Sequence, residues 1–226
     1  MPDTSNAAVG ACDFCDEFSG GQLNAYASRY GMPPPKRVIF ESGGFCIVPS
    51  LGQIVEGHLL IVPDHHICAL ADLAPEQILR LERLCQDVRS ILTSAYGECI
   101  FFEHGIRKVG SGGCGIEHAH MHALPVPLRA APSVLAEMFE GRRIRSLSNI
   151  KEELPDSSYI FFEDCCGGRS VFPIDRIPSQ YMRKLVAESI GKTDWDWRAG
   201  SHESELISTM HRLSSLFSWP AVPHRG

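Results

Sequence analysis

Three histidines alternate with apolar residues in the stretch HAHMHAL, residues 118–124. On a strand, residues two apart share a face, so the spacing predicts that the imidazoles of His118, His120 and His122 line one side of a strand. Imidazoles are poor core material because each ring needs a hydrogen-bond partner or a metal. An imidazole is also a competent nucleophile near neutral pH, and it can donate hydrogen bonds to phosphoryl oxygens. The pattern therefore favours phosphate chemistry, with a three-histidine metal site and a purely structural set as the alternatives.

A glycine-dense loop, residues 110–115 (GSGGCG), directly precedes these histidines. Glycines let successive backbone N–H groups turn toward one point, which creates an anion-binding nest. Such a loop by itself is typical of a flexible surface hairpin. Because it adjoins the histidines, we expect it to hold the phosphates of a substrate.

Cys12 and Cys15 form a C-x-x-C pair near the N-terminus of a chain with nine cysteines. This spacing is typical both of a redox pair and of half a zinc site. A thioredoxin-like role needs a preceding strand, and the residues before Cys12 carry no strand pattern. Zinc is the favoured interpretation, and it requires two further ligands.

The elements that must position these residues form an α+β pattern. Short apolar runs predict strands over 37–41, 45–48, 58–62, 99–103 and 116–124, and again at YIFFE and SVFPI after residue 157. Apolar residues at steps of three and four predict a long helix from Pro75 to Tyr96. Shorter helices are expected within 20–31, 179–190 and 203–217. We predict a mainly antiparallel sheet with a catalytic domain in 1–130 and an α+β extension, 131–226, packed on it.

The composition of the 226 residues narrows the function classes. Lys and Arg total 21 against 27 Asp and Glu, a net charge of −6, which argues against a protein that coats nucleic acid. No apolar run approaches the roughly 18 residues of a membrane span, and the first residues lack a secretory signal pattern. We therefore expect a cytoplasmic protein with no membrane partner.

Together with VEGHLLIVPDHH, residues 55–66, the motif HAHMHAL closely resembles the histidine triad (HIT) superfamily of nucleotide hydrolases and transferases. The resemblance implies an antiparallel sheet with a long helix, and a covalent mechanism. By similarity, His120 attacks the α-phosphorus of a nucleotide and forms a nucleotidyl-imidazole, which water or another acceptor resolves. His122 and His58 would contact phosphate oxygens and complete the catalytic set.

The resemblance also implies substrate contacts at Ser50, Ser111, Gly112, Gly113 and Cys114. Two of these positions depart from many relatives. Ser50 stands where an Asp or Asn often holds the ribose hydroxyls, and Cys114 stands where a Gln or Ser is common. The sequence therefore leaves the identity of the substrate open.

One branch of the superfamily has an N-terminal C-x-x-C that holds a structural zinc. By that resemblance the ligands are Cys12, Cys15, His66 and His118, a closed tetrahedral set. His65 is an alternative to His66 because the two are adjacent.

The function implied is hydrolysis of a nucleoside phosphoramidate, phosphoanhydride or dinucleoside polyphosphate by a homodimer. Nucleotidyl transfer through the same intermediate is the alternative enzyme. Hexose-1-phosphate uridylyltransferases usually have Gln at the third triad position, so His122 favours the hydrolase. A zinc-stabilised nucleotide sensor without turnover is the alternative from outside the enzyme class.

Overall fold

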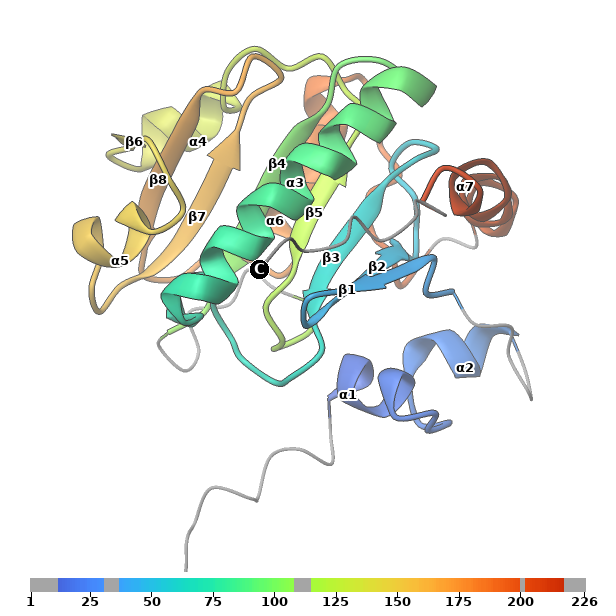
Figure 1. Cartoon of the computed structure of the whole chain (residues 1–226). Helices are drawn as coiled ribbons and strands as arrows, with labels where there is room; N and C mark the ends of the chain where they lie inside the picture. The colour runs from blue at the N-terminus through green and yellow to red at the C-terminus, as the bar shows by residue number, and fades with distance from the viewer. Residues whose placement is uncertain (1–11, 31–36, 108–114, 200–201, 218–226) are drawn as a thin grey trace, which may run out of the picture.

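The computed structural model describes residues 12–30, 37–107, 115–199 and 202–217 (Figure 1). Eight strands form one sheet in the order β1-β2-β3-β5-β4-β7-β8-β6, and all neighbouring strands are antiparallel. This confirms the predicted α+β class. The strands are β1 (Phe40–Ser42), β2 (Phe45–Pro49), β3 (Leu59–Pro63), β4 (Ile100–Gly105), β5 (Met121–Leu124), β6 (Arg142–Ile144), β7 (Ser158–Glu163) and β8 (Arg169–Ile174).

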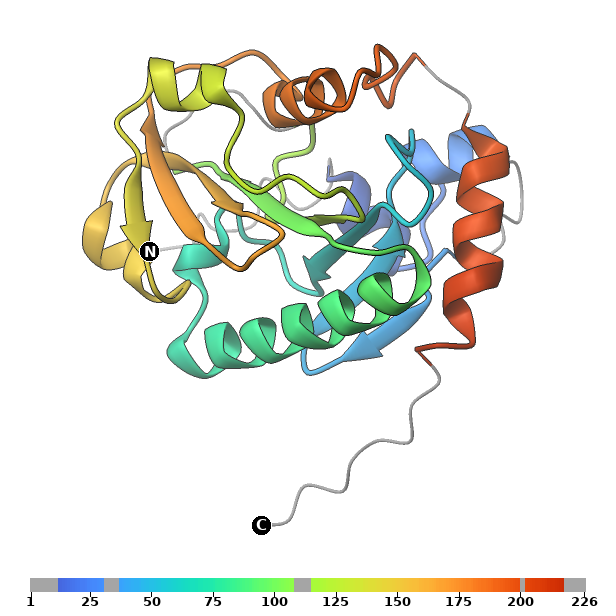
Figure 2. The ribbon, with the colours of Figure 1, turned by 90° about the horizontal axis from the view of Figure 1, so that it is seen from above.

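Helices cover both faces of the sheet (Figures 1 and 2). The long helix α3 lies across one face, α4 and α6 lie over the opposite face, and α7 stands beside β2 at one edge. In the described residues, no helix is long and apolar enough to cross a membrane. The helices are α1 (Asp13–Phe18), α2 (Ala25–Tyr30), α3 (Pro75–Ala95), α4 (Ser133–Met138), α5 (Asn149–Glu153), α6 (Tyr181–Ser189) and α7 (Glu203–Ser214), with a short 3₁₀ helix, η2 (Leu70–Asp72).

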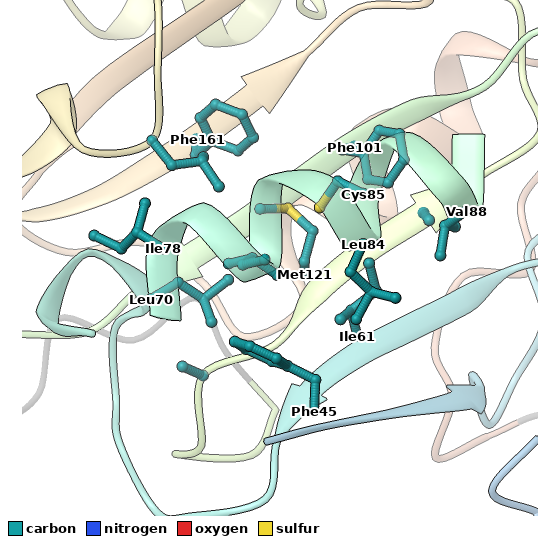
Figure 3. Close-up of a cluster of buried hydrophobic side chains, with 14 of the residues drawn as sticks. Phe45, Ile61, Leu70, Ile78, Leu84, Cys85, Val88, Phe101, Met121 and Phe161 are labelled. Carbon is teal, nitrogen blue, oxygen red and sulfur yellow. The ribbon is translucent and has the colours of Figure 1, made fainter. Parts of the chain in front are cut away.

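The main core lies between α3 and the sheet. Pro75 occupies the first turn of α3, where its missing N–H costs nothing, and Gly97 follows the helix with a φ of +111°. The apolar face of α3 packs against side chains from the strands, among them Met121 and Phe161 (Figure 3). The predicted helix and its buried face are therefore both found.

A second apolar cluster fills the space beneath α6. β4 serves both clusters, because Phe101 belongs to the core under α3 whereas Phe102 belongs to the one that includes Leu185 of α6. Successive side chains of a strand point to opposite faces. A strand buried on both faces explains why the sequence shows an uninterrupted apolar run at this position.

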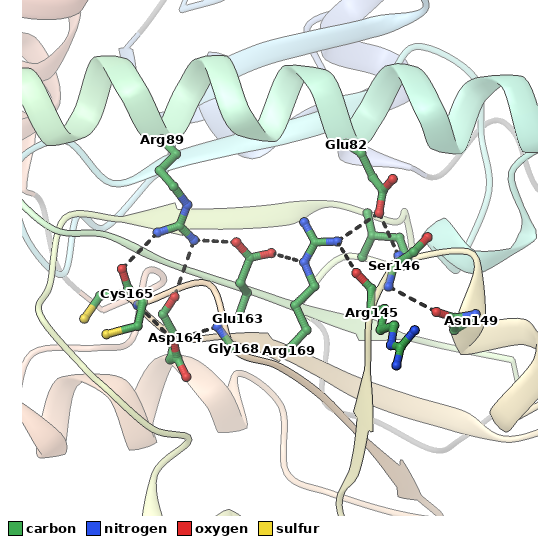
Figure 4. Close-up of polar contacts among 12 residues, drawn as sticks. Glu82, Arg89, Arg145, Ser146, Asn149, Glu163, Asp164, Cys165, Gly168 and Arg169 are labelled. Atoms are coloured by element: carbon green, nitrogen blue, oxygen red, sulfur yellow. Dashed lines mark hydrogen bonds and ion pairs between the residues drawn. The ribbon is translucent and has the colours of Figure 1, made fainter.

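The C-terminal residues contribute strands to the same sheet, since β4 pairs with β5 on one side and with β7 on the other. An ionic cluster reinforces this junction (Figure 4). Glu163 of β7 accepts hydrogen bonds from Arg89 of α3 at 2.5 Å and from Arg169 of β8 at 2.6 Å. Arg169 also pairs with Glu82 of α3 at 3.0 Å. The division at residue 130 stays a prediction.

Several elements differ from the sequence predictions. β5 begins at Met121, not at residue 116, because the backbone before it bonds elsewhere: the N–H of Ala119 donates to the carbonyl of Ile67 at 2.7 Å. The C-x-x-C lies at the start of a helix, α1, that was not predicted: Cys12 precedes its first residue and Cys15 lies in its first turn. β6, α4 and α5 were also missed, and all three are short.

Candidate functional site

The histidine motif turns its imidazoles away from α3. Ala119, Met121 and Ala123 belong to the core beneath that helix, whereas His120 and His122 line a pocket on the opposite face. The two rings are neighbours, with centroids 4.8 Å apart. The prediction of three imidazoles along one strand is wrong in part, because His118 and His120 precede β5 and the His118 side chain faces the N-terminal cysteines instead.

His120 is held by a backbone hydrogen bond. Its Nδ1 lies 2.6 Å from the carbonyl oxygen of His118. A carbonyl only accepts, so Nδ1 carries the proton and the lone pair of the neutral ring is on Nε2. Burial lowers the pKa of His120. Both effects present His120 as a neutral imidazole of one tautomer, which is the form a nucleophile requires.

His58 and His122 form a second imidazole pair. Nε2 of His58 lies 2.9 Å from Nδ1 of His122, and the ring of Phe102 stacks on His122 at 4.3 Å. His58 comes just before β3, and β3 pairs with β5 so that Leu60 faces His122. Burial lowers the pKa of both imidazoles, with a further contribution from Arg183 to each. The pair is therefore uncharged, and it lies directly beside His120.

His104, at the end of β4, is a pocket residue that the sequence analysis missed. It is buried, and within the described part of the chain its Nε2 has no hydrogen-bond partner. Burial lowers its pKa to about 3, and the proximity of the ionisable His120 contributes to this lowering. The register between β4 and β5 is the feature that could have identified His104. Phe102 lies opposite His122, and the same pairing continued by two residues sets His104 opposite His120.

The pocket encloses about 470 Å³, including space at its open mouth. Its walls come from distant parts of the chain: the N-terminal segment, the loop after β2, the histidine strand and the C-terminal region. The lining residues are Phe14, Arg37, Ser50, Leu51, Leu60, His104, Gly115, Ile116, His120, His122, Gln180, Arg183 and Trp197.

Ser50 lies in the pocket wall as the resemblance implied, but its hydroxyl is engaged. Ser50 Oγ accepts a hydrogen bond from Arg183 at 3.0 Å and donates to the carbonyl of Leu51 at 3.0 Å. The other four expected substrate contacts, Ser111, Gly112, Gly113 and Cys114, lie outside the described residues. They stay predictions.

Cys12, Cys15, His66 and His118 come together in one cluster, and their ligand atoms all lie within 4.8 Å of one another. Sγ of Cys12 is 3.3 Å from Nδ1 of His118, and Sγ of Cys15 is 3.5 Å from Nδ1 of His66. A tetrahedral zinc with bonds of about 2.0–2.3 Å sets such atoms roughly 3.5 Å apart.

The surroundings of this cluster also fit a metal. Nε2 of His118 lies 3.0 Å from the carbonyl of Pro63, which fixes the proton there and leaves Nδ1 as the ligand atom. His65, the alternative to His66, instead contacts Asp64 at 3.1 Å and is half exposed. The residues therefore suit a closed zinc site, and His66 is the histidine in position.

Phe14, within the C-x-x-C, connects this cluster to the pocket. Its buried ring meets His118 edge-on at 5.5 Å and His120 at 5.4 Å. The cluster of Cys12, Cys15, His66 and His118 thus lies against the wall that holds His120.

Comparisons with known proteins give one family model and several partial relatives. Residues 25–131 match a family model described as "Scavenger mRNA decapping enzyme C-term binding". CWF19-like protein 1 of Mus musculus is 22% identical over 196 residues, which cover 78% of this chain and 35% of that protein. Galactose-1-phosphate uridylyltransferase of Hypocrea jecorina is 30% identical over 117 residues, 50% of this chain and 30% of that protein. The chain spans about a third of the length of these curated relatives.

Among solved structures, a zinc-bound histidine triad family protein from Mycobacterium smegmatis aligns with a TM-score of 0.38 and 21% identity. The alignment covers 52% of this chain and 76% of that one.

Proposed function

We propose that this chain, whose histidine motif resembles that of histidine triad proteins, is a nucleotide-processing enzyme that works through a covalent nucleotidyl intermediate on His120. The observation that carries the proposal is the hydrogen bond between Nδ1 of His120 and the His118 carbonyl, within a pocket of neutral imidazoles. That contact leaves the Nε2 lone pair as the nucleophile.

The reaction has two displacements. In the first, Nε2 of His120 bonds to the α-phosphorus while the bond from phosphorus to the leaving group breaks, and the leaving group departs with that electron pair. In the second, a water oxygen attacks the phosphorus and the water gives up a proton to the solvent, while the phosphorus–nitrogen bond breaks and its electron pair returns to Nε2. We assign His122, which lines the pocket, to the phosphoryl oxygens, where hydrogen-bond donors stabilise the developing charge. His58 is fully buried and does not line the pocket, so we assign it to orienting the His122 ring through their 2.9 Å contact.

We propose hydrolysis of a nucleoside phosphoramidate, phosphoanhydride or dinucleoside polyphosphate as the reaction. Nucleotidyl transfer to a second substrate is the other candidate, and the relative named as a uridylyltransferase favours it. Both begin with the same intermediate, and they differ only in the acceptor that attacks it.

Cys12, Cys15, His66 and His118 are the residues that we propose to hold zinc. When bound, zinc in such a closed site supplies structural support and offers no open position to a substrate. These four residues would then fix the backbone around His118, whose carbonyl orients His120.

Intact-protein mass spectrometry after rapid mixing with adenosine phosphoramidate or diadenosine polyphosphates tests the proposal. We expect a nucleotidyl adduct on the native chain and steady release of nucleoside monophosphate. H120A should lose the adduct and all turnover, because it removes the nucleophile, while nucleotide binding remains.

H65A is the matched control, because His65 adjoins the metal cluster but points to Asp64. It should retain both the adduct and turnover. Wild-type rates in H120A would overturn the mechanism. Nucleotide binding without adduct or product in the native chain would instead identify a sensor.

A further inference from the structure

We propose that Arg183, on α6, binds a phosphate group of the nucleotide. The inference deepens the proposed function and rests on it. Arg183 lies outside residues 25–131, the part of the chain that the family model matches. It enters the pocket from the C-terminal region and faces the same space as His120 and His122.

The contacts of Arg183 are all to neutral groups. Its Nε donates to the carbonyl of Trp195 at 2.9 Å, Nη1 donates to Ser50 Oγ at 3.0 Å, and Nη2 donates to the carbonyl of Gly52. No carboxylate in the described ranges lies within the 4.0 Å of an ion pair with this side chain, although it is only 3% exposed. A buried charge without a counter-ion is costly, so such a group points to an anionic ligand.

Arg183 also has donors to spare. A guanidinium carries five N–H groups, and the three contacts use three of them. Two N–H groups on adjacent nitrogens are the arrangement that suits a phosphate. Burial lowers the pKa of Arg183 to about 9, so the side chain still carries its charge at neutral pH.

Arg37, the other arginine of the pocket, is neutralised. Its Nε and Nη2 donate to the two carboxylate oxygens of Glu17 at 2.7 and 2.6 Å. The acidic residues that act on Arg183 are more distant. Asp194 and Asp196 counteract the effect of burial on its pKa, but Asp196 is engaged by Gln180 at 2.6 Å and Asp194 by His202 at 2.7 Å.

The charge of Arg183 acts on the histidines of the proposed catalytic set. It contributes to the lowered pKa of His58, His120 and His122, in each case after burial itself. A phosphate between Arg183 and these rings would therefore meet one positive charge and several neutral donors.

The surrounding backbone fixes Arg183 before any ligand binds. Gly52 has a φ of +59°, and a Cβ at this position would collide with the backbone of Trp197. Gln180 joins the same segment, since its Oε1 accepts from the N–H of Trp197 at 3.1 Å. The loop after β2 and residues 195–197 thus hold the guanidinium from two sides, and a preorganised donor binds an anion at lower entropic cost.

Calorimetric titration of nucleotide and nucleoside pairs separates phosphate binding from structural support. The probes are AMP with adenosine and GMP with guanosine, and the proteins are the native chain, R183M, R183K and R89M. We expect R183M to weaken monophosphate binding about 10- to 100-fold, as the loss of charge-assisted hydrogen bonds does, with nucleoside affinity within about 3-fold. R183K keeps the positive charge but lacks the paired N–H donors of a guanidinium, so it should recover part of the monophosphate affinity that R183M loses.

R89M is the matched control, because Arg89 is also a partly buried, multiply bonded arginine but lies between α3 and β7. It should leave the ratio of nucleotide to nucleoside affinity unchanged. Equal losses for nucleotide and nucleoside in R183M, or no loss in either, would overturn the inference while the proposed function stands.

If the native chain binds no nucleotide, the proposed function fails and pyrophosphate becomes the probe. Pyrophosphate binding that R183M alone abolishes would still support Arg183 as an anion-binding residue. Pyrophosphate binding that R183M leaves intact, or no pyrophosphate binding by the native chain, would refute it.

Discussion

His118 serves three contacts at once. Its Nδ1 faces Cys12, its Nε2 lies against the carbonyl of Pro63, and its own carbonyl accepts from His120. The side chain of His118 therefore belongs to the cysteine–histidine cluster, while its backbone carbonyl holds the proposed nucleophile. A shift of the His118 backbone would therefore also move the carbonyl that lies 2.6 Å from Nδ1 of His120.

His104 gives the stability of the protein a defined pH dependence. Its pKa is about 3 in the folded chain and about 6.5 when unfolded. The unfolded chain therefore binds more protons below pH 6.5, and stability is complete above that pH and falls as the pH falls toward 3. Between pH 6.5 and 5 the expected loss from this residue is about 2 kcal/mol.

Urea unfolding at pH 5, 6 and 7 measures this loss. H104Q should reduce the slope of the unfolding free energy against pH by the contribution of roughly one proton. Other buried histidines, such as His58 and His122, maintain the remaining slope in both proteins. H211Q, at an exposed position on α7, is the control and should keep the native slope. An H104Q slope equal to the native one would contradict the assignment.

The sequence reveals part of the site and hides the rest. His120 and His122 can be predicted from the sequence because they alternate with apolar residues. His104 does not, because its role depends on the register between β4 and β5. Arg183 is harder to predict than His104, because only the packing of α6 brings it to Ser50, 133 positions away along the chain.

At the scale of elements, α1 depends on its surroundings. It has six residues and no side-chain cap at Cys12, and helices this short are not stable alone in water. Its anchors are the buried ring of Phe14 and the two cysteines that face His66 and His118. We therefore expect a metal ion to determine whether α1 stays in place.

C12S should lose zinc and stability together. Removing one of four ligands weakens the site, so we expect zinc content to fall from stoichiometric to near zero. The melting temperature should fall by about 4–8 °C, the shift that ~2 kcal/mol gives at this chain length. C46S, which alters a buried cysteine in β2 that is not one of the four clustered residues, should retain zinc. If C12S retains its full zinc content, Cys12 is not a zinc ligand.

Elements with strong patterns are those that the sequence predicts. α3 has five periodic apolar positions and both terminal signals, and its predicted ends are almost those observed. β6 has no such pattern, because Arg142 and Arg143 are exposed and only Ile144 is buried. Its place is determined by pairing with β8, a contact that no local pattern records.

At the scale of the molecule, one sheet and one ionic cluster join the N-terminal and C-terminal halves. Glu163 is the centre of that cluster, between Arg89 and Arg169. E163Q leaves Arg89 without its carboxylate and leaves Arg169 with Glu82 alone, which costs roughly 3 kcal/mol. Because β7 is a central strand, we expect a single unfolding transition, shifted as a whole to lower denaturant.

Circular dichroism and tryptophan fluorescence during urea unfolding test this expectation, since the two should coincide. E153Q is the control, because Glu153 forms an exposed pair with Arg142 that is worth less than about 1 kcal/mol. Two separate transitions in E163Q would mean that the halves are independently stable.

The position of β4 also determines how the chain folds while it is being made. β4 is complete at Gly105, but its second partner begins only at Ser158, and the 52 residues from 106 to 157 lie between them. At about 5–20 residues per second, a ribosome needs roughly 3–10 s to add that segment. During those seconds the apolar strand β4 has one edge without a partner strand. We therefore expect chaperones that bind extended segments to bind the nascent chain.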